Sequence, residues 1–431
     1  MYEEILKLAL DNIRPKAEDY AKIKEAVNKV MSAVKKFSDV NPVLVGSVAK
    51  DTWLKKDTDI DIFLPFSETV EYKTVVEEGI KTGKKVAKEL SADAILKYAN
   101  HPYVSFSYSG YDIEIVPCYK TDRPKTPVDR TLLHTEYVKK NLRKDLKDDV
   151  RLLKAFFKGI GVYGAESKVK GFSGYLTELI IMRCGSFIDS LRYLSSLKSL
   201  SIADPIDEKR DVASAVSLDT LAKCSLACNE FLRHPSIDFF IGRDTEKIKM
   251  EDIEISIVES ELHYLFLIFE RPKIVEEITI PQIERFINSC KNVLMDFGIL
   301  RVHYFIDTNV IISFVLRSGA LPRRIAVGGP PFYMYEDVKR FIRDKKIISG
   351  PYIKDGRVFV EINQKKRARN VLVDAISNEK VSFGKNLKEF IKNSSIYENT
   401  EIKYIAEKDE KINRFVREVL RADELWWLMR S

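Results

Sequence analysis

Two aspartates separated by one residue lie in an apolar stretch and are the side chains of this sequence best suited to chemistry. In DIDIFLPF, residues 59–66, Asp59 and Asp61 alternate with Ile60 and Ile62. Such alternation is typical of a β-strand with one buried face, so both carboxylates project from the same side. Two like charges held close together are unfavourable unless a cation lies between them, and Mg²⁺ is the usual cation for oxygen ligands. The pattern therefore predicts a divalent-metal site.

A second segment, YDIEIVPCY at residues 111–119, repeats this alternation with Asp112 and Glu114. A third carboxylate from a neighbouring strand would complete the metal site, and the spacing does not choose between Asp112 and Glu114. A single Asp-x-Asp pair more often lies on a solvated strand edge. Two carboxylate-bearing apolar strands in one small region favour the metal site instead.

A Gly-Ser pair precedes these strands and is followed by a predicted helix over residues 47–54. Backbone N–H groups and the Ser47 hydroxyl can hold phosphate oxygens at a helix N-terminus, with Lys50 one turn later. By itself such a pair is commonly only a helix N-cap. Together with the paired carboxylates it matches what a nucleoside triphosphate with Mg²⁺ requires. The sequence has no P-loop, because GIKTGKK at residues 79–85 has the wrong spacing for one.

The surrounding elements predict an α+β multidomain protein whose first domain covers residues 1–142. Apolar periodicity predicts helices over residues 1–15, 19–37 and 73–90. Strands are expected at residues 43–46 and 59–66, and in three successive runs between residues 94 and 119. This order of elements predicts a small mixed sheet with helices.

Residues 143–255 form a predicted second domain that is mostly helical, with helices over residues 148–161, 174–194 and 217–234. In the first of these helices Arg151, Lys154 and Lys158 share one face. We expect this face to line a phosphate-filled cleft, although a solvated helix face is the ordinary alternative.

Residues 256–431 form a predicted α+β C-terminal region. Asp355-Gly356 between alternating apolar residues predicts a hairpin turn. Basic residues in this region are candidates for contacts with RNA phosphates. They are Arg323, Arg324, Lys365, Lys366, Arg367 and Arg369.

Composition limits the possible classes of protein. The 431 residues carry 71 Lys and Arg against 64 Asp and Glu, a net charge of +7 that permits a polyanionic partner. Five scattered cysteines argue against a disulfide framework. No apolar run approaches the length of a membrane span, and the acidic, amphipathic first helix is unlike a leader, so we expect a cytoplasmic protein without membrane contact.

The motifs together resemble the archaeal, class I CCA-adding enzymes, which are tRNA nucleotidyltransferases of the polymerase-β-like superfamily. The segments that carry the resemblance include VGSVAKDTWLKKDTDIDIFLPF, IVPCYK, VDRTLLHTEYV, VRLLKAFFKGIGVYGAESKVKGFSGYLTEL and DPIDEKRDVASAVSLDTLA. The resemblance implies a nucleotidyltransferase catalytic domain, a helical nucleotide-binding central domain and a C-terminal tRNA-binding region. It implies addition and repair of the 3′-terminal CCA of tRNA from CTP and ATP, with two Mg²⁺ ions, by a homodimer.

The resemblance also assigns roles to individual residues. The implied metal ligands and catalytic residues are Asp59, Asp61 and Glu114, where many family members have aspartate at the third position. The implied nucleotide contacts are Ser47, Lys50, His134, Lys154, Tyr163 and Arg210. Lys50 stands where the family commonly has arginine, so it keeps the charge and loses the bidentate fork.

Two other functions share part of this pattern. A poly(A)- or oligoadenylate-type nucleotidyltransferase would have the same Gly-Ser and Asp-x-Asp motifs and would add A alone without a fixed end point. An RNA-binding protein with a degenerate transferase fold would have lost its carboxylates, and here they are present.

Overall fold

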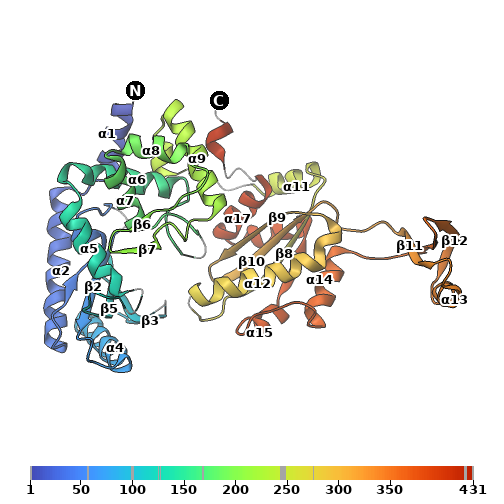
Figure 1. The fold of residues 1–431 in the computed structure, drawn as a ribbon, viewed down its shortest axis with the longest axis horizontal. Coiled ribbons are helices and arrows are strands. Elements are labelled where there is room, and N and C mark those ends of the chain that lie inside the picture. Colours follow the sequence, from blue (N-terminus) through green and yellow to red (C-terminus); the bar gives the residue numbers. More distant parts are fainter. Residues whose placement is uncertain are drawn as a thin grey trace. The chain divides into compact units, whose positions relative to one another are not determined.

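The structure is a computed structural model that describes residues 2–55, 58–98, 101–124, 126, 128–166, 169–242, 249–274, 276–421 and 425–429 (Figure 1). The chain divides into two compact units. The first unit is Met1–Asp244 with Leu425–Ser431, and the second unit is Thr245–Glu424.

A five-stranded sheet is the framework of the first part of the chain. Its order is β1 (Val43–Leu44), β2 (Asp59–Phe66), β5 (Tyr111–Tyr119), β4 (Pro102–Tyr108) and β3 (Ile95–Tyr98). Strands β2 and β5 are parallel, and the other pairs are antiparallel. Ile60, Ile62, Ile113 and Ile115 are completely buried, which confirms the predicted alternation of the two acidic strands.

Two helices cover the isoleucine face of this sheet, α2 (Ala17–Phe37) and α4 (Tyr72–Glu89). Val30 of α2 and Val75 of α4 are buried in the same hydrophobic cluster as Ile60 and Ile113. On the opposite face, Phe63 and Val116 pack against α5 (Asp129–Asn141). Each acidic strand therefore begins with carboxylates on that face and continues with apolar side chains.

The helix after the Gly-Ser pair is shorter than predicted. Helix α3 spans Gly46–Lys50 only, because Asp51 adopts a left-handed conformation with φ +57° and ends it. The predicted extension to Leu54 was wrong. Residues 51–54 form a loop that reaches the helical part of the unit.

The helical part of the first unit has a core of phenylalanines. Phe156, Phe187, Phe231 and Phe239 are mutually packed, with ring centroids 5.5–5.9 Å apart in the contacting pairs. Around them lie α1 (Tyr2–Ile13), α6 (Lys147–Gly159), α7 (Gly174–Cys184), α8 (Phe187–Ser195), α9 (Leu218–Arg233), α10 (Asp238–Ile241) and the 3-10 turns η1 (Lys144–Leu146) and η4 (Trp426–Met429). A short hairpin, β6 (Ala203–Asp204) with β7 (Asp207–Asp211), joins α8 to α9.

The single helix predicted over residues 174–194 is two helices in the structure. Gly185 has φ +84° and ends α7, and Ser186 caps α8 by accepting a hydrogen bond from the backbone of Asp189. A glycine in the left-handed region followed by a serine cap is a common helix junction, which periodicity alone does not detect.

The second unit contains a four-stranded antiparallel sheet buried on both faces. Its order is β14 (Ser395–Glu398), β8 (His263–Glu270), β10 (Asn309–Leu316) and β9 (Ile299–Ile306). Leu265 and Leu267 of β8 pack against α12 (Glu276–Leu294), α14 (Ala368–Ser377) and α15 (Lys388–Lys392), with η2 (Met295–Phe297) after α12. Tyr264 and Phe266 pack on the other face against α11 (Met250–Glu259), η3 (Asn399–Ile402), α16 (Lys403–Ala406) and α17 (Glu410–Arg421). Helices on both faces explain the continuous apolar runs of these strands.

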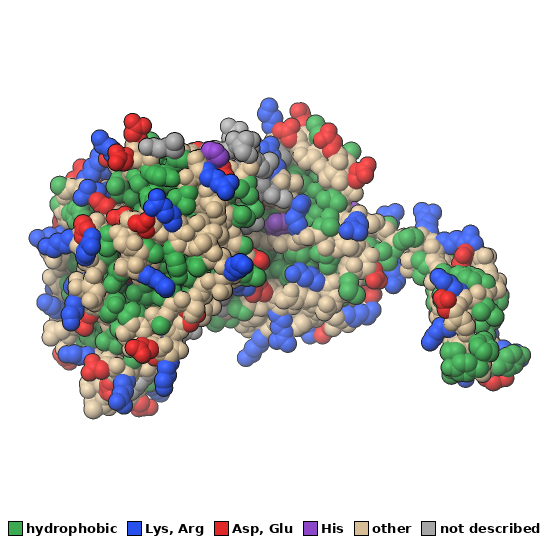
Figure 2. All heavy atoms as spheres, turned by 45° about the horizontal axis from the view of Figure 1, so that its top comes forward, with side chains coloured by type: hydrophobic (Ala, Val, Ile, Leu, Met, Phe, Trp, Pro, Cys, Tyr) green, Lys and Arg blue, Asp and Glu red, His purple; other side chains and the backbone are tan. Residues whose placement is uncertain are grey.

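The second unit also contains a three-stranded sheet, β11 (Arg324–Pro331), β13 (Arg357–Asn363) and β12 (Ile347–Lys354), with helix α13 (Tyr335–Arg343). Asp355 and Gly356 have positive φ and join β12 to β13, so the predicted hairpin is confirmed. Figure 2 shows hydrophobic side chains on the surface of this part. Phe332, Tyr333 and Ile353 are exposed hydrophobic residues of this sheet and its connections.

Within the described ranges, no helix combines the length and the apolar composition needed to cross a membrane.

Candidate active site

The parallel pairing of β2 with β5 brings the predicted carboxylates together. Asp61 lies opposite Glu114 and Asp59 lies opposite Asp112 in the register of the two strands. Side chains opposite one another in neighbouring strands are close, so the two segments form one acidic surface. Alternation in the sequence predicted which carboxylates share a face within each strand. The register of β2 and β5 shows which carboxylates of the two strands lie opposite one another.

Gly46 fits against the acidic surface because it has no side chain. A Cβ atom built on Gly46 would lie 1.9 Å from Asp61 Oδ2, and the residue has φ +69°. The neighbouring Val45 N–H donates to the Asp61 carbonyl oxygen at 3.0 Å. Glycine is therefore required at this position by both space and backbone conformation, and the Gly-Ser turn is held beside the Asp61 carboxylate.

The surroundings of Asp59 and Asp61 disfavour the ionised forms of their carboxylates. Burial, followed by the charges of Glu114 and Asp59, raises the pKa of Asp61 to about 7. Partial burial, then Glu114 and Asp112, also raises the pKa of Asp59. Both shifts have the direction expected when like charges gather without enough compensating cations. A divalent cation would relieve this repulsion.

Glu114 and Asp112, the two candidates for the third carboxylate, have different surroundings. Asp112 is exposed and accepts a hydrogen bond from Ser107 Oγ at 2.6 Å. Glu114 is half-buried, and its Oε1 accepts from Lys97 Nζ at 2.9 Å and from Tyr103 OH at 3.3 Å. As the side chains lie, no three His, Cys, Asp or Glu residues of the described chain are gathered as a metal cage. The donor set nevertheless fits a hard cation, because it offers carboxylate oxygens whose charge Lys97 compensates only in part.

Two lysines and a glutamate form a buried charge cluster in the same unit. Glu178 of α7 is completely buried, and its Oε2 accepts from Lys50 Nζ at 2.6 Å. Glu178 Oε1 accepts from Thr52 Oγ1 at 2.7 Å and from Lys154 Nζ at 3.5 Å. Lys154 also donates to the Thr52 carbonyl and hydroxyl oxygens, at 3.1 and 3.0 Å. Two of the predicted nucleotide contacts, Lys50 and Lys154, thus meet at one carboxylate.

Tyr163 lies next to this lysine cluster. A Cβ atom on Gly174 would be 2.9 Å from the Tyr163 hydroxyl oxygen and 3.9 Å from Lys154 Nζ. Burial, then the charges of Glu178 and Asp59, raises the pKa of Tyr163, so its hydroxyl keeps its proton as a donor. The ammonium group of the exposed Lys158 lies 4.7 Å from the centroid of the Tyr163 ring. Tyr163 and Lys154 therefore lie side by side in the same cluster.

His134 and Arg210 meet at a second buried carboxylate, that of Asp204. Asp204 Oδ2 is 2.9 Å from His134 Nε2 and accepts from Arg210 Nη1 at 2.8 Å, and its Oδ1 accepts from Tyr175 OH at 3.1 Å. The His134 and Tyr175 rings are stacked with centroids 3.7 Å apart. Burial lowers the pKa of His134 despite the opposing effect of Asp204.

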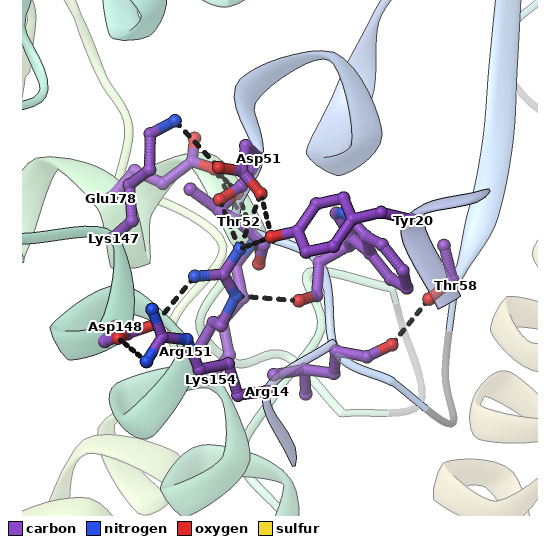
Figure 3. A network of polar contacts seen from close by, with 12 residues as sticks. Arg14, Tyr20, Asp51, Thr52, Thr58, Lys147, Asp148, Arg151, Lys154 and Glu178 are labelled. Atoms are coloured by element: carbon purple, nitrogen blue, oxygen red, sulfur yellow. Dashed lines mark hydrogen bonds and ion pairs between the residues drawn. The ribbon is translucent and has the colours of Figure 1, made fainter. Parts of the chain in front are cut away.

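Arg151 and Lys154 are buried and paired within the chain, so the alternative of a solvated helix face does not hold for these two residues. Figure 3 shows the Arg151 guanidinium next to Tyr20 and Asp51, and both Arg151 and Lys154 are buried. Arg151 donates to the Asp51 side chain and to Asp148, each at 2.7 Å, and to the Trp53 carbonyl oxygen at 3.1 Å. Helical spacing places residues on a common face, but it does not distinguish solvent from a buried polar partner.

Sequence reasoning missed the two carboxylates that organise these clusters, Glu178 and Asp204. Glu178 stands inside the apolar segment YLTELII, and a lone carboxylate there indicates a buried partner. Asp204 lies in a short hairpin and gives no comparable signal. The partners themselves could not be predicted, because Lys50 is 128 residues from Glu178 in the chain.

Known proteins resemble this chain over most of its length. Three family models match it: a nucleotidyltransferase domain at residues 27–149, the second domain of tRNA nucleotidyltransferase at residues 148–199 and 194–241, and the C-terminal domain of CCA-adding enzyme at residues 263–399. The CCA-adding enzyme of Methanocaldococcus jannaschii is 35% identical over 83% of this chain and 85% of its own length. The CCA-adding enzyme of Methanosarcina mazei is 32% identical over 95% of this chain and 97% of its own length. With this fold, these residues and these relatives, the chain belongs to the family of the CCA-adding enzymes.

Proposed function

We propose that this protein adds and repairs the 3′-terminal CCA of tRNA, using CTP and ATP and no nucleic-acid template. The observation that carries the proposal is the in-register pairing of Asp61 with Glu114, with the Gly46-Ser47 turn against Asp61. This arrangement provides a carboxylate cluster and a phosphate-binding turn side by side, as nucleotidyl transfer requires.

Asp59, Asp61 and Glu114 would hold two Mg²⁺ ions. Bound there, Mg²⁺ supplies Lewis acidity that favours ionisation of the tRNA 3′-hydroxyl and neutralises the departing pyrophosphate. Glu114 would accept the proton of the attacking hydroxyl. The raised pKa values of Asp59 and Asp61 support this assignment, since burial and then the neighbouring carboxylates disfavour the ionised forms that a bound cation would stabilise.

The triphosphate would be bound by side chains of the Gly-Ser turn and the lysine cluster. Ser47 contributes a hydroxyl, Lys50 and Lys154 contribute ammonium groups, and Tyr163 contributes a phenolic O–H donor. His134 and Arg210, held together at Asp204, would contact the nucleotide beyond the phosphates. Arginine is suited to a base edge because its planar fork offers several donors in fixed directions.

The proposed organisation divides the work among three regions: catalysis in residues 1–142, nucleotide binding in residues 143–255 and tRNA binding in residues 256–431. Separate hydrophobic clusters in the sheet region, the helical region and the second unit support three regions. Their boundaries differ from the proposed ones, since α1 packs in the helical cluster and α11 packs in the second unit. We further propose that the protein works in the cytoplasm as a homodimer, as the resemblance implies.

The test of this function is incubation of the purified protein with tRNA lacking its CCA terminus, Mg²⁺ and labelled CTP, ATP, UTP or GTP. We expect incorporation of two C residues and one A residue, after which addition stops. Continued addition of A would instead identify a poly(A)-type enzyme. No incorporation from any nucleotide would contradict both functions.

A further inference from the structure

We propose that Glu178 is a positioning residue that holds Lys50 and Lys154 in place to bind the triphosphate of the incoming nucleotide. This inference rests on the proposed function, because that function places a triphosphate at the two lysines. Glu178 itself is completely buried and would not touch the nucleotide. Its action would pass through the lysines it binds.

The contacts of Glu178 join two regions of the first unit. Lys50 and Thr52 come from α3 and the loop after it, beside the acidic strands, whereas Lys154 lies on α6 and Glu178 on α7 of the helical core. One carboxylate binds both ammonium groups, with Nζ to oxygen distances of 2.6 Å for Lys50 and 3.5 Å for Lys154. A single side chain therefore fixes the relative positions of two cations from different parts of the fold.

The charge balance of the cluster separates a binding role from a purely structural one. Two ammonium groups share the one carboxylate of Glu178, so this carboxylate does not balance both charges. An ammonium group has three N–H donors. Those of Lys154 all have acceptors, which are the Thr52 carbonyl and hydroxyl oxygens and Glu178, whereas among the described residues Lys50 donates only to Glu178. The remaining donors of Lys50, with the charge of Lys154 behind them, suit an anion with several oxygens, such as a triphosphate.

The groups around Lys154 govern how its charge responds to pH. Burial is the largest effect and lowers the pKa of Lys154 to about 8, Glu178 opposes this lowering, and Lys50 and Arg151 add to it. The hydroxyl of Tyr163 lies close by and stays protonated. Without the charge of Glu178, Lys154 would lose its proton at a lower pH.

The test compares Glu178→Gln with the unchanged protein for binding of inorganic triphosphate, CTP and ATP, measured by calorimetry in Mg²⁺ buffer. We expect Glu178→Gln to weaken all three ligands by a similar factor of about tenfold or more, since the variant removes a charged partner from both lysines. In CCA addition the KM for CTP and ATP should rise by the same factor, while the KM for tRNA stays within about twofold. Unchanged affinity for inorganic triphosphate would overturn the inference, as would a loss confined to one nucleotide.

Two further variants separate positioning from folding. Thr177→Val is the matched control, because Thr177 is a buried neighbour on α7 whose hydroxyl donates to the Ser173 carbonyl oxygen at 2.8 Å, outside the cluster. It should leave all three affinities unchanged. Thr52→Val keeps every charge and removes the hydroxyl that links Lys154 to Glu178, so we expect a loss of about threefold for each ligand. If Glu178→Gln does not fold, as circular dichroism and thermal melting would reveal, Thr52→Val decides the question, and unchanged binding in it would overturn the inference.

A pH series on the same ligands gives an independent readout. The affinity of the unchanged protein for inorganic triphosphate should weaken as pH rises through about 8, relative to a Lys154→Met variant. In Glu178→Gln this weakening should begin at least about one pH unit lower, and identical profiles would contradict the inference. If the unchanged protein adds no CCA while these binding effects appear, the proposed function fails and the role of Glu178 stands. If the unchanged protein adds CCA while Glu178→Gln and Thr52→Val bind all three ligands normally, the proposed function stands and the role of Glu178 fails.

Discussion

Asp51 and Asp61 lie close in the sequence, in the same unit, and their surroundings have opposite effects on their charge. Burial alone would raise the pKa of Asp51, but hydrogen bonds from Tyr20 and Lys147 and the charge of Arg151 lower it below its usual value. Burial and two neighbouring carboxylates raise the pKa of Asp61 to about 7. Asp51 is thus part of a satisfied network, and Asp61 is part of an unsatisfied one.

The opposite pKa shifts of Asp51 and Asp61 distinguish charge clusters that stabilise the fold from a candidate binding site. In the Arg151 network of Figure 3, acidic and basic groups pair within the chain and stabilise the packing of α6 on the loop after α3. At the acidic surface of β2 and β5, the charges need a partner that the chain provides only in part, through Lys97. Residues whose charge is left unbalanced by the fold are candidates for ligand binding.

The strongest test of the comparison is the substitution Asp61→Asn. We expect incorporation of CMP and AMP into tRNA to fall by at least about 10³-fold, because a metal ligand is lost where charge develops during transfer. The thermal midpoint without metal should stay the same or rise, because a repelled charge is removed. Both quantities are measured on the same preparation, by labelled nucleotide incorporation and by calorimetry.

Asp112→Asn is the matched control for that substitution. Asp112 stands on β5, is exposed and is bonded to Ser107, so its loss should change activity by less than about threefold. If Asp112→Asn were inactive and Glu114→Gln active, the third carboxylate would be Asp112, and our assignment of Glu114 would be wrong.

Arg151→Met tests the network around Asp51, in which acidic and basic groups are paired within the chain. We expect the free energy of unfolding to fall by about 2–3 kcal/mol, at the low end for a broken buried ion pair because Asp51 remains partly solvated. Activity should change by less than about threefold at temperatures where the variant is folded. Urea titration measures the first quantity, and nucleotide incorporation the second.

Arg192→Met provides a matched control for Arg151→Met. Arg192 pairs with Asp189 three residues earlier, as Arg151 pairs with Asp148, but the Arg192 pair is exposed. Its loss should cost less than about 0.5 kcal/mol. Equal destabilisation by the two substitutions would contradict the structural role assigned to Arg151.

The pH dependence of stability should also distinguish the two networks. The raised pKa of Asp61 means that the folded protein binds more protons than the unfolded chain between the ordinary aspartate value, near pH 4, and about pH 7. The contribution of Asp61 to stability therefore falls as pH rises through this window. Subtracting the thermal midpoints of Asp61→Asn from those of the unchanged protein isolates this contribution.

Mg²⁺ should reverse the loss of stability above pH 7, because it binds the ionised carboxylates of the folded state. In Asp61→Asn the stabilisation by Mg²⁺ should be much smaller. An equal response of the two proteins to Mg²⁺ would separate Asp61 from the metal site.

Local sequence patterns group side chains that share one strand face, but they do not predict which distant residues contact one another. The two-residue period of a strand fixes which side chains share a face, so Asp59 could be grouped with Asp61, and Asp112 with Glu114, before any coordinates. The choice of Glu114 over Asp112 came from the family resemblance. The positions of Glu178, Asp204 and Arg151 depend on contacts between distant segments, which no local period encodes. Helix α3 ended early and α7 ended at Gly185 for the same kind of reason, since single residues with positive φ interrupt an apolar pattern that otherwise continues.

The smallest expected effect concerns exposed cations of the second unit. Lys365, Lys366 and Arg367 are exposed before α14, whereas Arg369 pairs with Glu398 and Glu401. If the first three contact tRNA phosphates, replacing all of them by glutamine should weaken tRNA binding about tenfold and reduce the slope of log affinity against log salt by about 2. The matched control is the double substitution of Lys388 and Lys392, both paired with Glu379, which should leave the slope unchanged. An unchanged salt slope in the triple variant would mean that exposed, unpaired cations of the second unit do not bind tRNA. The distinction between paired and unpaired charges, drawn from Asp51 and Asp61, would then not extend to exposed cations.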